Sequence, residues 1–232
     1  YVISKMNGNV SLLEKLIRLI YPAKCMVCDA VLNEDTYLYL CEPCKNDLPR
    51  YQKGFFKSMQ MPYLDGIFAA FYYSEGIKNA IHSMKFKSHP RLAQTMVSLI
   101  CDEMFKHKPV PDFDLIVPVP MHPKKKRQRG YNQAELLANE IARILNKDVC
   151  GDILIKIQNT TAQIQLKRED RLMNLKSAFV INDSIIKNNS YGRVLLVDDV
   201  LTTGTTVSTC AKILKENGFP SVYALVIAIA EK

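Results

Sequence analysis

The segment 193–207, RVLLVDDVLTTGTTV, is the feature that most limits the fold of this chain. Its run from Val194 to Val197 contains only β-branched and aliphatic residues, which is typical of a strand buried on both faces of a parallel sheet. The carboxyl end of such a strand opens into a crevice where α/β proteins bind ligands. Asp198 and Asp199 follow at that end, and their adjacent carboxylates can accept hydrogen bonds from vicinal hydroxyls or help to hold a hydrated Mg²⁺.

The loop after the two acids has the composition of a phosphate-binding loop. It supplies one glycine for close backbone approach and four hydroxyls, directly before a helix predicted over Val207–Asn217, whose first free N–H groups attract anions. The loop residues are Thr202, Thr203, Gly204, Thr205 and Thr206. A strand with a polar turn is the ordinary alternative, because acids at strand ends and threonine-rich helix caps are common. The combination is nevertheless specific, and it is not a Walker A loop because no Gly-Lys-Ser/Thr follows.

This order of strand, acids and hydroxyl loop resembles the signature with which type I phosphoribosyltransferases bind 5-phosphoribosyl 1-pyrophosphate (PRPP). The resemblance implies that Asp198 and Asp199 hold the ribose hydroxyls, which makes them the candidate catalytic residues. It implies in the same way that the segment 202–206 holds the 5-phosphate and that Mg²⁺ binds together with the pyrophosphate.

Four of the seven cysteines form two CxxC pairs separated by twelve residues. They are Cys25, Cys28, Cys41 and Cys44. Two such pairs can complete a tetrahedral sulfur site for a structural Zn²⁺, although the spacer is slightly short for a four-cysteine site. Between the pairs, Ala30–Leu32 and Thr36–Leu40 flank a polar turn and predict the hairpin of a zinc ribbon. The alternative is a redox dithiol, which would need a CxxC pair at the head of a helix in a thioredoxin-like context.

An amphipathic helix is predicted ahead of the cysteines, over residues 11–20, with Ser11 at its cap. Leucines and isoleucines recur there at helical spacing, with Glu14, Lys15 and Arg18 on the other side. We expect the apolar side to pack on its own domain, with binding to a membrane surface as the alternative.

Composition limits the partners and the location. A formal net charge of +8 favours polyanionic ligands such as nucleotides, phosphorylated sugars, nucleic acid or anionic lipid. No apolar run is long enough to span a bilayer, and the cysteines do not form the pattern of a secreted disulfide framework. We therefore expect a soluble, cytoplasmic protein without a membrane span.

Strands and helices alternate along the rest of the chain and predict an α/β fold. Strands are predicted over 67–73, 115–119, 153–157, 194–197 and 222–230, and helices over 77–84, 91–105, 133–145 and 207–217. This alternation predicts an open, mostly parallel sheet. The resemblance of the segment 193–207 implies that the sheet is of the type I phosphoribosyltransferase kind. The predicted domains are residues 1–50, with the N-terminal helix and zinc ribbon, a linker over 51–65, and a phosphoribosyltransferase-like domain over 66–232.

Two basic segments are candidates for anion binding. Five cations lie within residues 124–129, directly after the strand that ends at Val119, so this predicted loop can point into the same crevice as Asp198. Most charge runs are only solvated surface, which is the alternative here. Lys85, in the sequence Lys-Phe-Lys, belongs to the second segment. His122 precedes the first, with a locally hydrogen-bonded role more expected than acid–base work.

The order of these motifs resembles the ComF (ComFC) competence family over nearly the whole chain. The marks are the N-terminal helix, the four cysteines, Lys85–Lys87, Pro118–Pro120 with His122-Pro123, the segment 127–133 (RQRGYNQ), Thr161, Gln163, Arg171, Asn174 and the Asp-Asp-Thr-Thr-Gly loop. Members resemble cytoplasmic phosphoribosyltransferase-fold proteins with a zinc ribbon that act in uptake of single-stranded DNA during natural transformation. The resemblance implies that Arg127 and Arg129 meet the pyrophosphate. Lysines at 124–126 stand where the family often has arginine, which implies weaker binding of the pyrophosphate.

Two functions remain open at this stage. In the first, the chain is a phosphoribosyltransferase with an unknown acceptor, whose catalysis is positional and electrostatic. In the second, it is a non-enzymatic accessory protein with a vestigial PRPP site, whose cations and aromatic residues bind single-stranded DNA. Docking on a DNA-uptake helicase or another competence protein through the ribbon is a further possible role.

Overall fold

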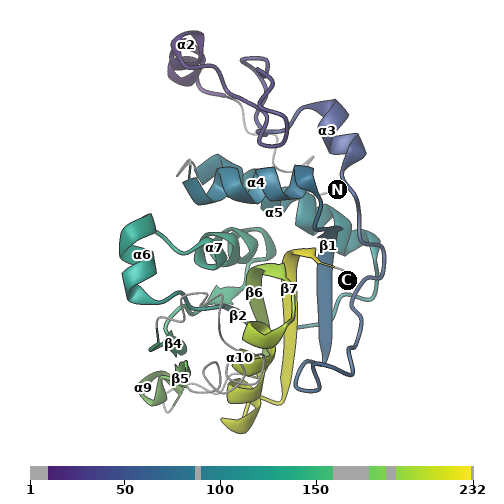
Figure 1. The fold of residues 1–232 in the computed structure, drawn as a ribbon, viewed down its shortest axis with the longest axis vertical. Helices are drawn as coiled ribbons and strands as arrows, with labels where there is room; N and C mark the ends of the chain where they lie inside the picture. Colours follow the sequence, from purple (N-terminus) through teal and green to yellow (C-terminus); the bar gives the residue numbers. More distant parts are fainter. Residues whose placement is uncertain (1–9, 87–89, 159–177, 187–191, 231–232) are drawn as a thin grey trace, which may run out of the picture.

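Five parallel strands form the central sheet of the computed structural model, which describes residues 10–86, 90–158, 178–186 and 192–230. The strand order is β1-β7-β6-β2-β3, and every neighbouring pair is parallel. The bounds are β1 Gly66–Tyr72, β2 Leu115–Pro118, β3 Asp148–Val149, β6 Arg193–Leu201 and β7 Ser221–Ile229. The predicted open α/β sheet is confirmed, with β6 at its centre (Figure 1).

Helices cover both faces of the sheet because β6 and its neighbours carry apolar side chains on both sides. Val194 and Leu196 of β6 pack with α10 (Thr205–Glu216). Leu195 and Val197 belong to the core on the other face, with α4 (Glu75–Phe86), α5 (Pro90–Lys106) and α7 (Gln133–Leu145). Successive side chains of a strand point to opposite faces, so an unbroken aliphatic run requires this double cover.

The edge of β1 is covered by the segment that precedes it. Antiparallel bridges join Arg50 to Phe71 and Phe56 to Ile67, and the Tyr51 ring packs edge-on against the Tyr72 ring, with centroids 5.1 Å apart. This segment therefore occupies backbone groups that an edge strand otherwise leaves open. The domain boundaries at 50 and 65 stay a prediction.

The N-terminal part contains α2 (Leu12–Ile20) and α3 (Glu42–Asp47). Ser11 caps α2 as predicted, accepting a hydrogen bond from the Glu14 N–H at 3.2 Å. The predicted hairpin is wrong: Val31 is bridged to Lys24, across the first cysteine pair, and 36–40 forms no strand. The buried residues around the cysteines belong to the same core as α4 and α5.

Two further sequence predictions are wrong. The predicted strand at 153–157 forms β4 (Leu154–Lys156), which pairs antiparallel with β5 (Phe179–Ile181) in a separate sheet, while β3 joins the main sheet. The basic segment predicted as a loop is a helix, α6 (Pro123–Arg129). His122 caps its start, Pro123 suits its first turn, and Gly130 ends it with φ of 88°.

The short helix α9 (Asp183–Ile186) follows β5. In the described part of the chain, no helix has the length and apolarity to span a membrane.

Candidate functional site

The two acids lie on opposite faces of β6. Pairing with β7 continues past Asp198, which is opposite Val226, so the acids are within the strand and not beyond its end as predicted. Asp199 forms an ion pair with Lys85 of α4, with Nζ and Oδ2 2.7 Å apart. Asp198 accepts a hydrogen bond from the Asp199 backbone N–H at 2.8 Å. Each carboxylate thus has its own environment, one on the α4 side and one on the α10 side of the sheet.

Asp198 holds its proton more strongly than an ordinary aspartate. Burial, together with the adjacent Asp199 carboxylate, raises the pKa of Asp198 to about 7, against the opposing effect of Lys85 and Lys156. A neutral acid is favoured there because desolvation and a like charge both penalise the ionised form. At neutral pH the group is therefore poised between its charged and neutral forms.

Lys156 is a candidate site residue that the sequence motifs did not identify. It lies on β4, and its Nζ is 4.9 Å from the centre of the Phe179 ring. Burial and the nearby Lys125 of α6 lower the pKa of Lys156, while Cys210 and Asp198 raise it. A lone lysine in a short strand carries no motif, so only the fold reveals that it faces Asp198.

The loop between β6 and α10 turns at a glycine in the left-handed region. Gly204 precedes α10 with φ of 72°, a conformation that strains other residues. A Cβ there would also lie 2.3 Å from the Met61 sulfur. The hydroxyl oxygens of Thr203 and Thr205 are 2.9 Å apart. Thr202 and Thr203 are exposed, and Thr206 is half-buried in the first turn of α10.

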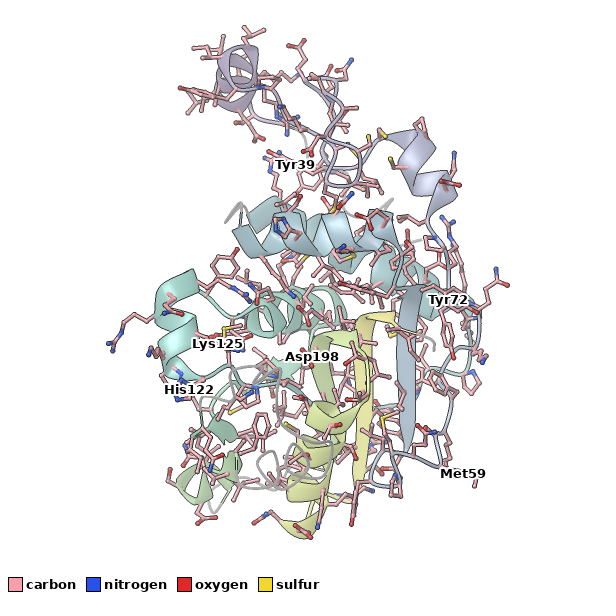
Figure 2. The ribbon with its side chains drawn as sticks, in the orientation of Figure 1. Tyr39, Met59, Tyr72, His122, Lys125 and Asp198 are labelled. Atoms are coloured by element: carbon pink, nitrogen blue, oxygen red, sulfur yellow. The ribbon has the colours of Figure 1, made fainter. Side chains whose placement is uncertain are left out.

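The cations of α6 are mostly exposed to solvent. Lys124, Lys125 and Arg127 are exposed, whereas Lys126 pairs with Glu135 at 2.6 Å. Arg129 donates to the buried Gln133 side chain. Lys125 and Asp198 are labelled in Figure 2, which shows α6 beside the carboxyl end of the sheet. No described contact joins Arg127 or Arg129 to the acids of β6.

The junction of α6 and α7 is held between α4 and β2. The Tyr131 hydroxyl donates to the Met84 carbonyl of α4, and the Asn132 side chain donates to the Val119 carbonyl at 3.0 Å. Asn132 also caps α7 through the Ala134 N–H. These bonds fix α6 relative to both Lys85 and β2. Lys87, Thr161, Gln163, Arg171 and Asn174 lie outside the described residues.

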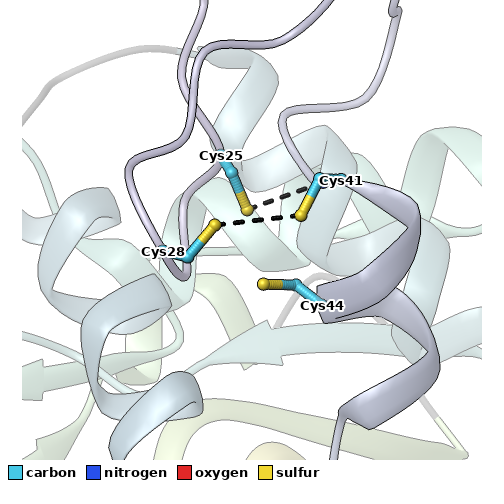
Figure 3. Close-up of side chains that lie close together, drawn as sticks. All are labelled: Cys25, Cys28, Cys41 and Cys44. Carbon is cyan, nitrogen blue, oxygen red and sulfur yellow. Dashed lines mark hydrogen bonds between the residues drawn. The ribbon is translucent and has the colours of Figure 1, made fainter.

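The four cysteine sulfurs converge, as Figure 3 shows. The four sulfur atoms all lie within 4.8 Å of one another, and those of Cys28 and Cys41 are 3.8 Å apart. Zinc bonds of ~2.3 Å to four sulfurs in a tetrahedron require an edge of about 3.8 Å. Although burial raises the pKa of Cys25, backbone N–H groups of Cys28, Cys41 and Val27 lower it to about 7. These residues fit a structural Zn²⁺ with all four positions filled by thiolates.

Cys41 begins α3, which is the placement that the redox alternative requires. The second pair of thiols beside it fits a metal site better than a lone dithiol.

Comparisons with known proteins point to one family. The chain is 31% identical over 187 residues to competence protein F of Haemophilus influenzae, covering 78% of this chain and 81% of that protein. It is 30% identical over 154 residues to the DNA utilization protein YhgH of Escherichia coli K12, covering 65% of this chain and 66% of that protein. No protein-family model matches.

Solved phosphoribosyltransferases are among the structural neighbours. An adenine phosphoribosyltransferase structure aligns with a TM-score of 0.41 at 13% identity, covering 81% of this chain and 98% of that one. The strand order β1-β7-β6-β2-β3 of this chain itself establishes the open parallel sheet.

Replacing one zinc ligand should release the metal and destabilise the N-terminal part. We expect Cys28→Ser to lower bound zinc from one ion per chain to a small fraction, because a hydroxyl is a poor zinc ligand at neutral pH. Atomic emission spectrometry of dialysed protein measures this, with Cys150→Ser as the control outside the cluster. Equal zinc content in parent and Cys28→Ser would contradict the assignment.

The raised pKa of Asp198 predicts a pH-dependent cost to stability. In the unfolded chain the group ionises near pH ~4, but in the folded chain near about 7. The contribution of Asp198 to stability is thus complete below the pKa of the unfolded chain, and it is lost as the pH rises through the folded pKa of about 7. In buffer without divalent cations or phosphate, the melting temperature of Asp198→Asn minus that of the parent should increase from pH ~5 to ~8.

Asp112→Asn is the matched control for this titration. A hydrogen bond from Lys147 and the charge of Arg193 lower the pKa of Asp112. Asp112 therefore makes its full contribution to stability above the pKa that it has in the unfolded chain. The melting temperature of Asp112→Asn minus that of the parent should stay constant between pH ~5 and ~8. If the melting temperature of Asp198→Asn minus that of the parent stays constant or falls with pH, ionisation of Asp198 does not destabilise the protein.

Proposed function

Because this chain belongs to the competence protein F (ComF) family, we propose that it binds PRPP with Mg²⁺ at the carboxyl end of β6 and acts in DNA uptake during natural transformation. One observation carries the proposal: Asp198 and Asp199 lie near the carboxyl end of β6, two residues before the hydroxyl loop that leads into α10. Carboxylates suit the ribose hydroxyls of this ligand, and a helix start with free N–H groups suits its phosphate.

The proposed roles follow from the two environments of the acids. Asp198, on the α10 side near the loop, accepts hydrogen bonds from the ribose once it is ionised. Lys85 holds Asp199 in place and offsets its charge before the ligand arrives. The hydroxyls of Thr203 and Thr205, together with the backbone of the loop, bind the 5-phosphate.

The cations beside the site suit the leaving pyrophosphate. Four side chains can neutralise the charge of the pyrophosphate while C1 of the ribose gains positive character. They are Lys85, Lys156, Arg127 and Arg129. A bound Mg²⁺ supplies further charge neutralisation on the pyrophosphate oxygens. If the chain is an enzyme, the C1–oxygen bond to pyrophosphate breaks as an acceptor bonds to C1. The acceptor is the open part of the proposal.

Calorimetric titration of PRPP with Mg²⁺ into the zinc-loaded protein tests the pocket. The parent should give saturable heat, and each of Asp198→Asn and Asp199→Asn should bind about 10- to 100-fold more weakly, since each loses a charge-assisted hydrogen bond. Asp112→Asn, an exposed carboxylate in an ion pair with Lys147 and Arg193, is the control and should bind like the parent. Absence of saturable heat in the folded, zinc-loaded parent would contradict the proposal.

Single-stranded DNA is a second candidate ligand, which the exposed cations of α6 favour. Lys124, Lys125 and Arg127 project from a helix whose acidic neighbour, Glu135, is already paired with Lys126. Such a surface suits backbone phosphates, whose binding releases counterions and weakens as salt rises. Binding of this kind is compatible with a PRPP pocket, because both ligands are anions.

Salt-dependent binding of an oligonucleotide tests this second function. The slope of log K against log salt should become shallower by about 1 to 1.5 in Lys124→Glu/Lys125→Glu, since each single-strand phosphate contact contributes ~0.7. Lys57→Glu/Lys108→Glu changes the net charge equally at exposed positions away from α6 and should keep the parent slope. An affinity that is flat with salt in the parent, or equal slopes in both double variants, would contradict it.

A further inference from the structure

The helix α2 packs on the protein through its polar side. Arg18 is only 6% exposed, and its guanidinium donates to the carbonyls of Glu34 at 2.9 Å and Thr36 at 2.8 Å. It also pairs with Glu14, one turn earlier, at 2.9 Å. The Arg18 guanidinium lies 5.6 Å from the centre of the Tyr39 ring. A buried arginine with these partners fixes which side of the helix faces inward.

A second arginine fixes the same side from α5. Arg91 pairs with the remaining carboxylate oxygen of Glu14, and it lies 5.0 Å from the centre of the Tyr37 ring. Glu14 is thereby held between Arg18 and Arg91. Rotation of α2 would break both charge-assisted contacts, so the helix is locked in this orientation.

The apolar side of α2 consequently faces solvent. Its exposed residues are Leu12 78%, Leu13 68%, Leu16 55%, Ile17 51%, Leu19 71%, Ile20 75% and, directly after the helix, Tyr21 76%. This overturns the expectation that the apolar side packs on its own domain. We name these seven residues the α2 face; in Figure 1 it lies on the outermost helix, away from the sheet. A surface helix normally buries its apolar side, so the arrangement is the reverse of the usual one.

We propose that the α2 face is a self-association surface, where the α2 helices of two copies of this chain pair about a two-fold axis. Seven large apolar residues, each more than half exposed, offer a patch beyond the several hundred Å² that a monomer ordinarily exposes. A standard interface requires about 800 Å² from each partner, which this face and its surroundings can supply. A two-fold interface uses the same patch on both subunits, and the largely apolar side chains of this face set no donor and acceptor pattern that a second copy must match.

The local charges favour a second copy over an anionic membrane. The chain carries a net charge of +8, which opposes association wherever the cations are free. Both cations of α2 are paired, however: Lys15 with Asp35 and Arg18 with Glu14. Two copies can therefore approach through α2 with little repulsion. A helix that binds anionic lipid typically presents free lysines and arginines on its polar side, and here that side is occupied by the protein itself.

Sedimentation velocity of the zinc-loaded protein without PRPP tests the proposal independently of the proposed function. From about 1 to 100 µM the parent should shift from monomer to dimer, as mass action requires. Leu16→Glu and Ile20→Glu each place a carboxylate near its two-fold mate and should weaken the dimer at least ~10-fold. Met59→Glu is the matched control, because Met59 is 99% exposed and lies in the segment before β1 (Figure 2). It should dimerise like the parent.

Each outcome decides the proposal. Dimer formation that both α2 variants lose and Met59→Glu keeps, with normal zinc content in all proteins, supports it. A parent that stays monomeric over the whole range, or a dimer that both α2 variants retain, overturns it. Flotation with vesicles of phosphatidylcholine and phosphatidylglycerol by a monomeric parent, lost in Leu16→Glu, would overturn it in favour of a lipid surface.

Discussion

Two adjacent carboxylates at the end of a buried strand are costly, and much of the fold around β6 offsets that cost. Burial and mutual repulsion raise the pKa of Asp198, while Lys85 is drawn from α4 to within 2.7 Å of Asp199. The charge of Lys156, on β4, also acts on Asp198 and favours its ionised form. Without a ligand, this arrangement stabilises the protein less than an apolar strand end would. A perturbed acid of this kind beside a helix start is typical of a ligand site.

The strand order explains how these distant segments meet. Lys85 is 114 positions before Asp199 in the sequence, yet α4 and α7 share one face of the sheet with the end of β6. Tyr131 and Asn132 fasten the start of α7 to α4 and β2. The basic helix α6 is therefore held at the same end of the sheet as the acids.

Much of the core could be predicted from sequence because its signals are local. The aliphatic run of β6, the helical pattern over 133–145 and the glycine at 204 each predict their own structure. The convergence of the four cysteines also follows from their spacing. These features depend on periodicity and on backbone chemistry within a few residues of one another.

The errors concern long-range partners. A run of charged residues has no apolar periodicity, so its pattern does not predict the helix α6. The structure shows that His122 and Gly130 cap this helix. A short apolar run predicts a strand but not its sheet, which misplaced β4. Amphipathicity shows that α2 has two sides but not which is buried, because that choice depends on Arg91, far along the chain. Lys156 belongs to no motif, and only its tertiary contacts identify it.

If the end of β6 and the loop before α10 form one ligand site, a crystal structure of the zinc-loaded protein grown with PRPP and Mg²⁺ will show it. We expect the 5-phosphate against residues 202–206, the ribose hydroxyls within hydrogen-bonding distance of Asp198 or Asp199, and the pyrophosphate toward Lys85. Ligand density at another surface, with the Lys85–Asp199 pair unchanged and the loop empty, would contradict it.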